Sequence, residues 1–170
     1  IYPTRHVQRM AELGFLGMLV DVKYDGGGMD TVSYVLAMEE ISKVDSSCSV
    51  IMSVNNSLVC YGLEAFGTEV QKEKYLKPLA RGEKIGAFLL SEPNAGSDAT
   101  SQKTIATDMG DYYLVNGTKN WITNGNTAGT YLLIAQTHPE KMHKGINCLI
   151  VDRNTPGIRV GPHEDKMGMR

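Results

Sequence analysis

The first half of the chain carries apolar residues at the spacing that helices need. Val7, Met10 and Leu13 recur at three-residue intervals, so they fall on one face of a helix. Three glycines at 26–28 predict a loop, and Asp30 beyond them is a suitable N-cap for a second helix. The second helix is apolar around most of its circumference, which is typical of a buried helix. Its apolar positions are Val32, Tyr34, Val35, Leu36, Met38 and Ile41.

Two more helices are predicted before residue 84. The segment 48–66 is largely apolar and is too long for a single strand, so we expect a helix there. Thr68 and Gln71 have the T-x-x-Q spacing of a capping box and predict the start of the next helix. We expect Pro78 and Gly82 to end it.

From Gly86 onward the pattern changes to short apolar runs separated by turn residues. No helical pattern lies between these runs, so we expect an antiparallel sheet. The fold class predicted is therefore α+β, with a helical domain at 1–84 and an antiparallel β-barrel or sandwich domain at 85–170. The expected strands lie at 86–90, at 130–136, at 146–151, at 157–161, and as three strands joined by turns within 104–125.

Composition is that of an ordinary globular protein. Hydrophobic residues make up 42% of the 170 residues, charged residues make up 21%, and the formal net charge is −2. This charge gives no reason to expect nucleic acid or a membrane surface as a partner. The three cysteines show no C-x-x-C spacing, which favours a reducing compartment over a disulfide framework.

A polar loop follows the first predicted strand. In the sequence 91–98, SEPNAGSD, Pro93 fixes a turn, Gly96 permits close approach, and Ser97 with the backbone N–H groups could bind phosphate oxygens. The loop is not a known phosphate-binding fingerprint, and by itself it is better explained as a connection between strands.

The only tryptophan lies in the sequence 121–125, WITNG. Alternation along a strand places Trp121 and Thr123 on one face, where an aromatic plane and a hydroxyl could hold a ring system. A tryptophan in the core of a β-sandwich explains the same residues. The four histidines lie far apart in polar surroundings, so no metal site is predicted.

Taken together, these segments closely resemble the acyl-CoA dehydrogenase family, in order and spacing, over essentially the whole chain. The helical segments are most similar to the short-chain, or butyryl-CoA, branch of that family. The motifs that carry the resemblance are LLSEPNAGSD at 89–98, VNGTKNWITNG at 115–125, DRNTPGIRVG at 152–161 and EDKMGMR at 164–170, together with SVNNSL at 53–58 and the segment 66–88.

The resemblance implies three domains: N-terminal helices, a middle β domain and a C-terminal four-helix domain. This chain resembles most of the first and all of the second, so we expect the C-terminal domain, and the catalytic base that the family carries there, to lie outside it. We therefore assign no catalytic residue. We also expect these 170 residues alone to bind FAD weakly if at all and not to turn over substrate.

The resemblance also assigns binding residues. FAD is the implied cofactor, and an acyl-CoA thioester is the implied substrate. The expected flavin-ring contacts are Phe88, Leu90, Ser91, Trp121 and Thr123; the expected pyrophosphate contacts are Gly96 and Ser97; the expected substrate contacts are Val54, Asn55 and Ser97.

The implied reaction is α,β-dehydrogenation of a short-chain acyl-CoA to the trans-2-enoyl-CoA, as in fatty acid β-oxidation. Electrons would leave to an electron-transfer flavoprotein, and the full-length protein would be a homotetramer in the cytoplasm of a bacterium or in a mitochondrial matrix. An acyl-CoA oxidase, and a non-enzymatic module that binds a nucleotide or a protein, are the alternatives.

Overall fold

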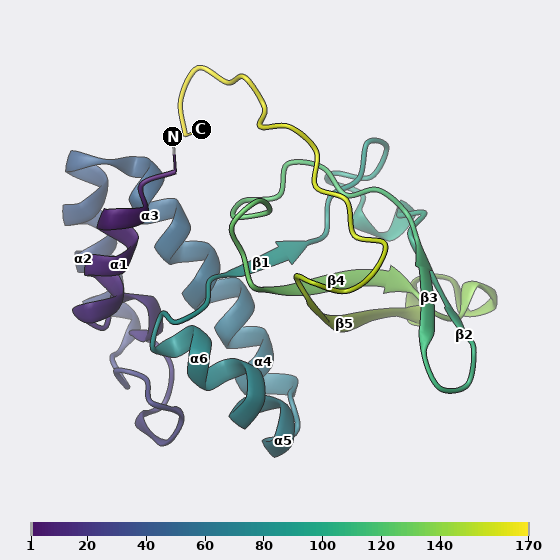
Figure 1. Cartoon of the computed structure of the whole chain (residues 1–170), viewed down its shortest axis with the longest axis horizontal. Helices are drawn as coiled ribbons and strands as arrows, with labels where there is room; N and C mark the ends of the chain where they lie inside the picture. The colour runs from purple at the N-terminus through teal and green to yellow at the C-terminus, as the bar shows by residue number, and fades with distance from the viewer. Residues whose placement is uncertain (1, 170) are drawn as a thin grey trace.

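The computed structural model describes residues 2–169, and it divides them into a helical part and a β part. Figure 1 shows the helices gathered on one side and the strands on the other, with β1 running from the helices into the sheet. No helix among residues 2–169 has the length and apolar character needed to cross a membrane.

Helices account for the part of the chain before residue 81. Short 3₁₀ turns at Phe15–Gly17 and Val22–Tyr24 lie between the first two α-helices, α1 and α2. Two π-helical stretches join neighbouring α-helices into longer continuous ones, Val54–Cys60 between α3 and α4 and Lys72–Leu76 between α5 and α6. The α-helices are α1 Thr4–Glu12, α2 Thr31–Val44, α3 Ser46–Ser53, α4 Tyr61–Phe66, α5 Glu69–Gln71 and α6 Lys77–Ala80.

Local capping chemistry starts two of these helices, α2 and α5, where the sequence predicts. The Asp30 carboxylate accepts a hydrogen bond of 2.7 Å from the Ser33 N–H at the start of α2. Thr68 and Gln71 form the predicted capping box at the start of α5. Each cap satisfies N–H groups that the first turn of a helix otherwise leaves free.

The prediction that α2 is buried on most sides is wrong. Tyr34 is buried, but Val32, Val35 and Leu36 are 68%, 53% and 58% exposed. Their side of the helix has no neighbour among residues 2–169. An apolar pattern shows that a face favours burial, but it does not show which chain segment covers that face.

Five strands form one sheet in the order β1-β4-β2-β3, with β5 also paired to β4. The α+β fold class is confirmed, but the sheet is mixed rather than antiparallel, because β1 pairs with β4 in parallel. Residues 90–129 make a long crossover between these two strands, and a crossover needs length, not a helix. The strands are β1 Gly86–Leu89, β2 Ile105–Asp108, β3 Tyr113–Asn116, β4 Thr130–Gln136 and β5 Ile146–Asp152.

Two predicted strands do not form. Residues 119–122 are irregular and lead into a turn at 123–127, and residues 157–161 do not pair with any strand among residues 2–169. Ile158 and Val160 alternate with non-apolar residues, whereas Trp121 and Ile122 are adjacent. In either case a segment becomes a strand only where a neighbour can accept its backbone hydrogen bonds.

One buried side chain joins the helical part to the sheet. Asn55 is fully buried; its amide nitrogen donates to Leu16 O at 2.8 Å and to Leu79 O at 3.2 Å. Its amide oxygen accepts a hydrogen bond of 2.8 Å from Gly86 N, the first residue of β1. A Cβ at Gly86 would lie 2.5 Å from a Val59 methyl, so only glycine lets the strand approach this closely.

We predict that Asn55→Ala destabilises the fold by roughly 2–3 kcal/mol, because it leaves the buried Gly86 N–H and the Leu16 carbonyl without partners. The measurement is the free energy of unfolding in urea, followed by circular dichroism. Asn94→Ala, which changes an exposed asparagine, is the matched control and should unfold at the wild-type midpoint. Equal midpoints for both variants would show that Asn55 is not the junction.

Candidate functional site

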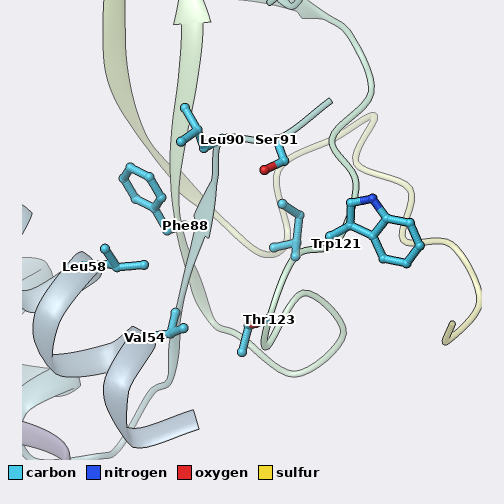
Figure 2. A pocket seen from close by; sticks show the side chains of 8 residues that line it. Val54, Leu58, Phe88, Leu90, Ser91, Trp121 and Thr123 are labelled. Atoms are coloured by element: carbon cyan, nitrogen blue, oxygen red, sulfur yellow. The ribbon is translucent and has the colours of Figure 1, made fainter. Parts of the chain in front are cut away.

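A cavity of about 270 Å³ lies where the π-helical stretch, the end of β1 and the loop 119–126 meet. Figure 2 shows Val54 and Leu58 facing it from the helix, Phe88, Leu90 and Ser91 along the strand end, and Trp121 and Thr123 on the loop. The cavity is therefore built by both halves of the chain. Its lining residues are Val54, Leu58, Phe88, Leu90, Ser91, Trp121, Ile122 and Thr123.

All five side chains predicted to contact a flavin ring line this cavity. Val54, predicted to contact the substrate, lines it as well, on the helical side. Gly96 and Ser97 lie outside it, on an exposed part of the loop that follows Glu92. At Gly96 an added Cβ would meet no atom within 4 Å, so the surface beside this residue is open.

Asn55 does not line the cavity, although we expected it to do so. Its side chain is absent from the cavity lining and is committed to the hydrogen bonds that join the helices to β1. Asn55 and Val54 are neighbours in sequence, and consecutive helical residues face different directions. The role of Asn55 is thus to position the wall that Val54 and Phe88 form.

Leu58 and Ile122 line the cavity but were not predicted. Leu58 lies four residues after Val54, and residues at that spacing share a helix face, so this signal was available in the sequence. Ile122 is different, because strand alternation assigns it to the face opposite Trp121 and Thr123. The backbone at 119–125 is irregular rather than extended, which removes that alternation and brings all three residues to the cavity.

The cavity wall is apolar and carries two hydroxyl groups, from Ser91 and Thr123. None of the eight lining residues is acidic or basic, so this wall offers no general base. Such a surface suits a flat, largely apolar ring whose edge accepts or donates a few hydrogen bonds. Trp121 is 66% exposed and has a left-handed backbone (φ 60°), an uncommon conformation for a bulky residue that is often found at functional sites.

A buried ion pair lies behind the cavity. Lys119 Nζ and Glu92 Oε1 are 2.8 Å apart, and both side chains are only 6% exposed. A buried pair adds little net stability, but removing one partner leaves an uncompensated charge and costs about 3–5 kcal/mol. Neither residue was predicted to matter, because nothing local in the sequence indicates that residues 92 and 119 meet.

Glu92 is held as a carboxylate. Burial by itself raises the pKa of Glu92, but hydrogen bonds from Lys119, Thr104 and two backbone N–H groups outweigh burial and bring it to about 2. A carboxylate with so low a pKa is a weak base, and this one does not face the cavity. Glu92 is therefore not a candidate for the general base.

The family comparisons agree with this arrangement. Residues 1–83 match the N-terminal domain of acyl-CoA dehydrogenase, and residues 87–170 match the middle domain. This chain belongs to the acyl-CoA dehydrogenase family. The cavity therefore lies between the parts of the chain that match these two domains of the family.

Similar proteins extend well beyond this chain. It is 44% identical over 169 residues to the short-chain specific acyl-CoA dehydrogenase of Clostridium acetobutylicum, covering 99% of this chain and 45% of that protein. Among solved structures, butyryl-CoA dehydrogenase from Megasphaera elsdenii gives a TM-score of 0.95 at 44% identity, over 99% of this chain and 45% of that one. A chain from structural work on the electron transferring flavoprotein of Acidaminococcus fermentans gives 0.96 at 45% identity, over 99% and 44%. This chain thus spans less than half the length of these relatives.

We predict that Glu92 makes stability depend on pH in the acid range. Its pKa in the folded state is about 2 and its ordinary value is 4.5, so its contribution is complete above about pH 4.5 and is lost as pH falls toward 2. The difference in unfolding free energy between wild type and Glu92→Gln should therefore be largest near neutral pH and narrow on acidification. The exposed Glu140→Gln is the control and should follow the wild type throughout; a pH-independent difference for Glu92→Gln would contradict the assignment.

Proposed function

We propose that this chain provides two domains of an FAD-dependent acyl-CoA dehydrogenase that converts a short-chain acyl-CoA thioester to the trans-2-enoyl-CoA. The observation that carries the proposal is the cavity, because residues from the helices, from β1 and from the loop 119–126 converge on one apolar wall with two hydroxyl groups. Membership of the family and the likeness to butyryl-CoA dehydrogenase support the reaction and the substrate class.

The residues present fit a flavin. Phe88 and Leu90 give an apolar surface for a ring, and Ser91 and Thr123 give hydroxyl groups for its polar edge. We assign the pyrophosphate to Gly96 and Ser97, where the exposed loop leaves room beside its backbone. When bound, FAD supplies the acceptor for the hydride that leaves the substrate.

We propose that the residues of this chain bind the substrate and orient it. Val54 and Leu58, on the helical side of the cavity, would contact a short acyl group, and the apolar wall would exclude water from the reacting carbons. Removal of the α proton needs a base, and none of the described residues that line the cavity can supply it. The division of labour we propose is therefore binding and orientation by this chain, with proton removal by a group outside the described lining.

Electron transfer and assembly complete the proposal. We propose an electron-transfer flavoprotein as the electron acceptor, which the likeness to a chain from work on such a protein supports. A homotetramer is proposed for the full-length protein. Mitochondrial and bacterial relatives at the same identity support a mitochondrial matrix or a bacterial cytoplasm as the compartment.

FAD should quench the fluorescence of Trp121, the only tryptophan, because the flavin ring would lie beside it. Thr123→Val should weaken the FAD affinity obtained from this quenching by roughly threefold to tenfold, the effect of one lost hydrogen bond. Thr127→Val is the matched control, since it removes an exposed hydroxyl from the same loop and should leave the affinity unchanged. Equal FAD affinities for the two variants would show that Thr123 makes no hydrogen bond to FAD.

The reaction itself is tested by butyryl-CoA-dependent dye reduction in a form of the protein that spans the length of its relatives. We expect activity there, highest kcat/KM for short acyl chains across a chain-length series, and slow reaction with oxygen. Fast peroxide formation would instead favour an acyl-CoA oxidase. Robust dye reduction by residues 1–170 alone would contradict our assignment of the base to a group outside this chain.

A further inference from the structure

The two loops that line the cavity are tied together behind it. Lys119 donates all three of its ammonium hydrogens to acceptors on the segment 90–102: Leu90 O at 2.9 Å, Glu92 Oε1 at 2.8 Å and Gln102 Oε1 at 3.0 Å. Leu90 lines the cavity, and Lys119 lies two residues before Trp121, which also lines it. One side chain thus connects the strand-end wall to the loop wall.

Glu92 anchors the other end of this connection. Its Oε2 accepts a hydrogen bond of 2.6 Å from Lys103 N, and its Oε1 accepts one of 3.0 Å from Thr104 N and another from the Thr104 hydroxyl. Thr104 N–H and the Lys103 N–H belong to the chain just before β2. The carboxylate therefore fixes the ammonium of Lys119 to the sheet.

The backbone beside the ion pair is held as well. Asn120 N donates to Ser91 O at 2.8 Å, so the two cavity loops are hydrogen-bonded directly next to Lys119. On the other side, a Cβ at Gly117 would lie 2.2 Å from the Thr104 hydroxyl oxygen, so this segment lies directly against Thr104. These contacts leave little room for the loop 117–121 to shift toward or away from Leu90 and Ser91.

We propose that Lys119, paired with Glu92, is a positioning residue that sets the spacing between the Leu90–Ser91 wall and the Trp121–Thr123 wall. Neither side chain lines the cavity, so the pair acts through the backbone of the two loops. A lysine suits this place because three donors on one atom match three acceptors, while its charge compensates the buried carboxylate. That the two walls hold a flavin rests on the proposed function. That Lys119 connects the two walls does not depend on it.

The test compares Lys119→Met with Lys103→Met, a matched control that removes an exposed lysine on the segment facing Glu92. The double variant Glu92→Gln with Lys119→Met removes both charges, so no unpaired buried charge remains to unfold the chain. Three quantities are measured in each: circular dichroism for the fold, fluorescence anisotropy of Trp121 for the freedom of its loop, and FAD affinity for the site.

We expect Lys119→Met and the double variant to keep the wild-type circular dichroism, to lower the anisotropy of Trp121, and to weaken FAD affinity by about tenfold, the scale of one charge-assisted hydrogen bond. Lys103→Met should match the wild type in all three. Loss of stability in Lys119→Met and its recovery in the double variant are expected whatever the pair does for the site. A merely structural ion pair would leave the anisotropy and FAD affinity of the double variant unchanged.

The proposal is overturned by unchanged Trp121 anisotropy in both variants, by unchanged FAD affinity in both, or by loss of the whole fold in both. FAD affinity is measured in a form of the protein that spans the length of its relatives. If that form gives no FAD signal, the proposed function fails, and the Trp121 anisotropy of residues 1–170 still decides whether Lys119 holds the two walls together.

Discussion

The structure depends most on the hydrogen bonds of one buried amide. Asn55 ties two carbonyls of the helical part to the first N–H of β1, and the glycine at 86 lets that strand lie against Val59. A fully buried amide of this kind is costly unless every polar atom has a partner, and here each partner comes from a different part of the chain. The junction therefore forms only when the helices and the sheet are both in place, and that arrangement creates the cavity.

The cavity wall is apolar, but polar contacts behind it keep the two loops that form it in place. The wall offers no charge, whereas the groups that keep its two loops in register, Lys119 and Glu92, are charged and lie behind it. A flavin ring needs a smooth apolar surface with a few hydroxyl groups at its edge, and charges within the wall would interfere with that surface. Because the ion pair lies behind the cavity wall and not in it, the pair can fix the shape of the site while the cavity lining stays apolar.

Much of this could be predicted from the sequence where the signal is local. The caps at Asp30 and Thr68 were predictable because their partners lie three residues away. Family motifs indicated five residues that line the cavity and that we expected to contact a flavin. The features that could not be predicted are contacts between residues far apart in the sequence. The parallel pairing of β1 with β4 and the meeting of Glu92 with Lys119 depend on a crossover that no local pattern reveals. The exposure of Val35 could not be predicted either. The apolar pattern of its helix shows a preference for burial, but it does not show which segment would cover that face.

The central claim is that one cavity, built jointly by the helices and the sheet, binds the flavin. Hydrogen–deuterium exchange with and without saturating FAD, in a form of the protein that spans the length of its relatives, tests it most directly. We predict that FAD slows exchange together in peptides covering 52–60, 86–98 and 119–126, and leaves α1 and the β2–β3 hairpin unchanged. Protection confined to one of these segments, or appearing elsewhere within residues 1–170, would contradict the claim.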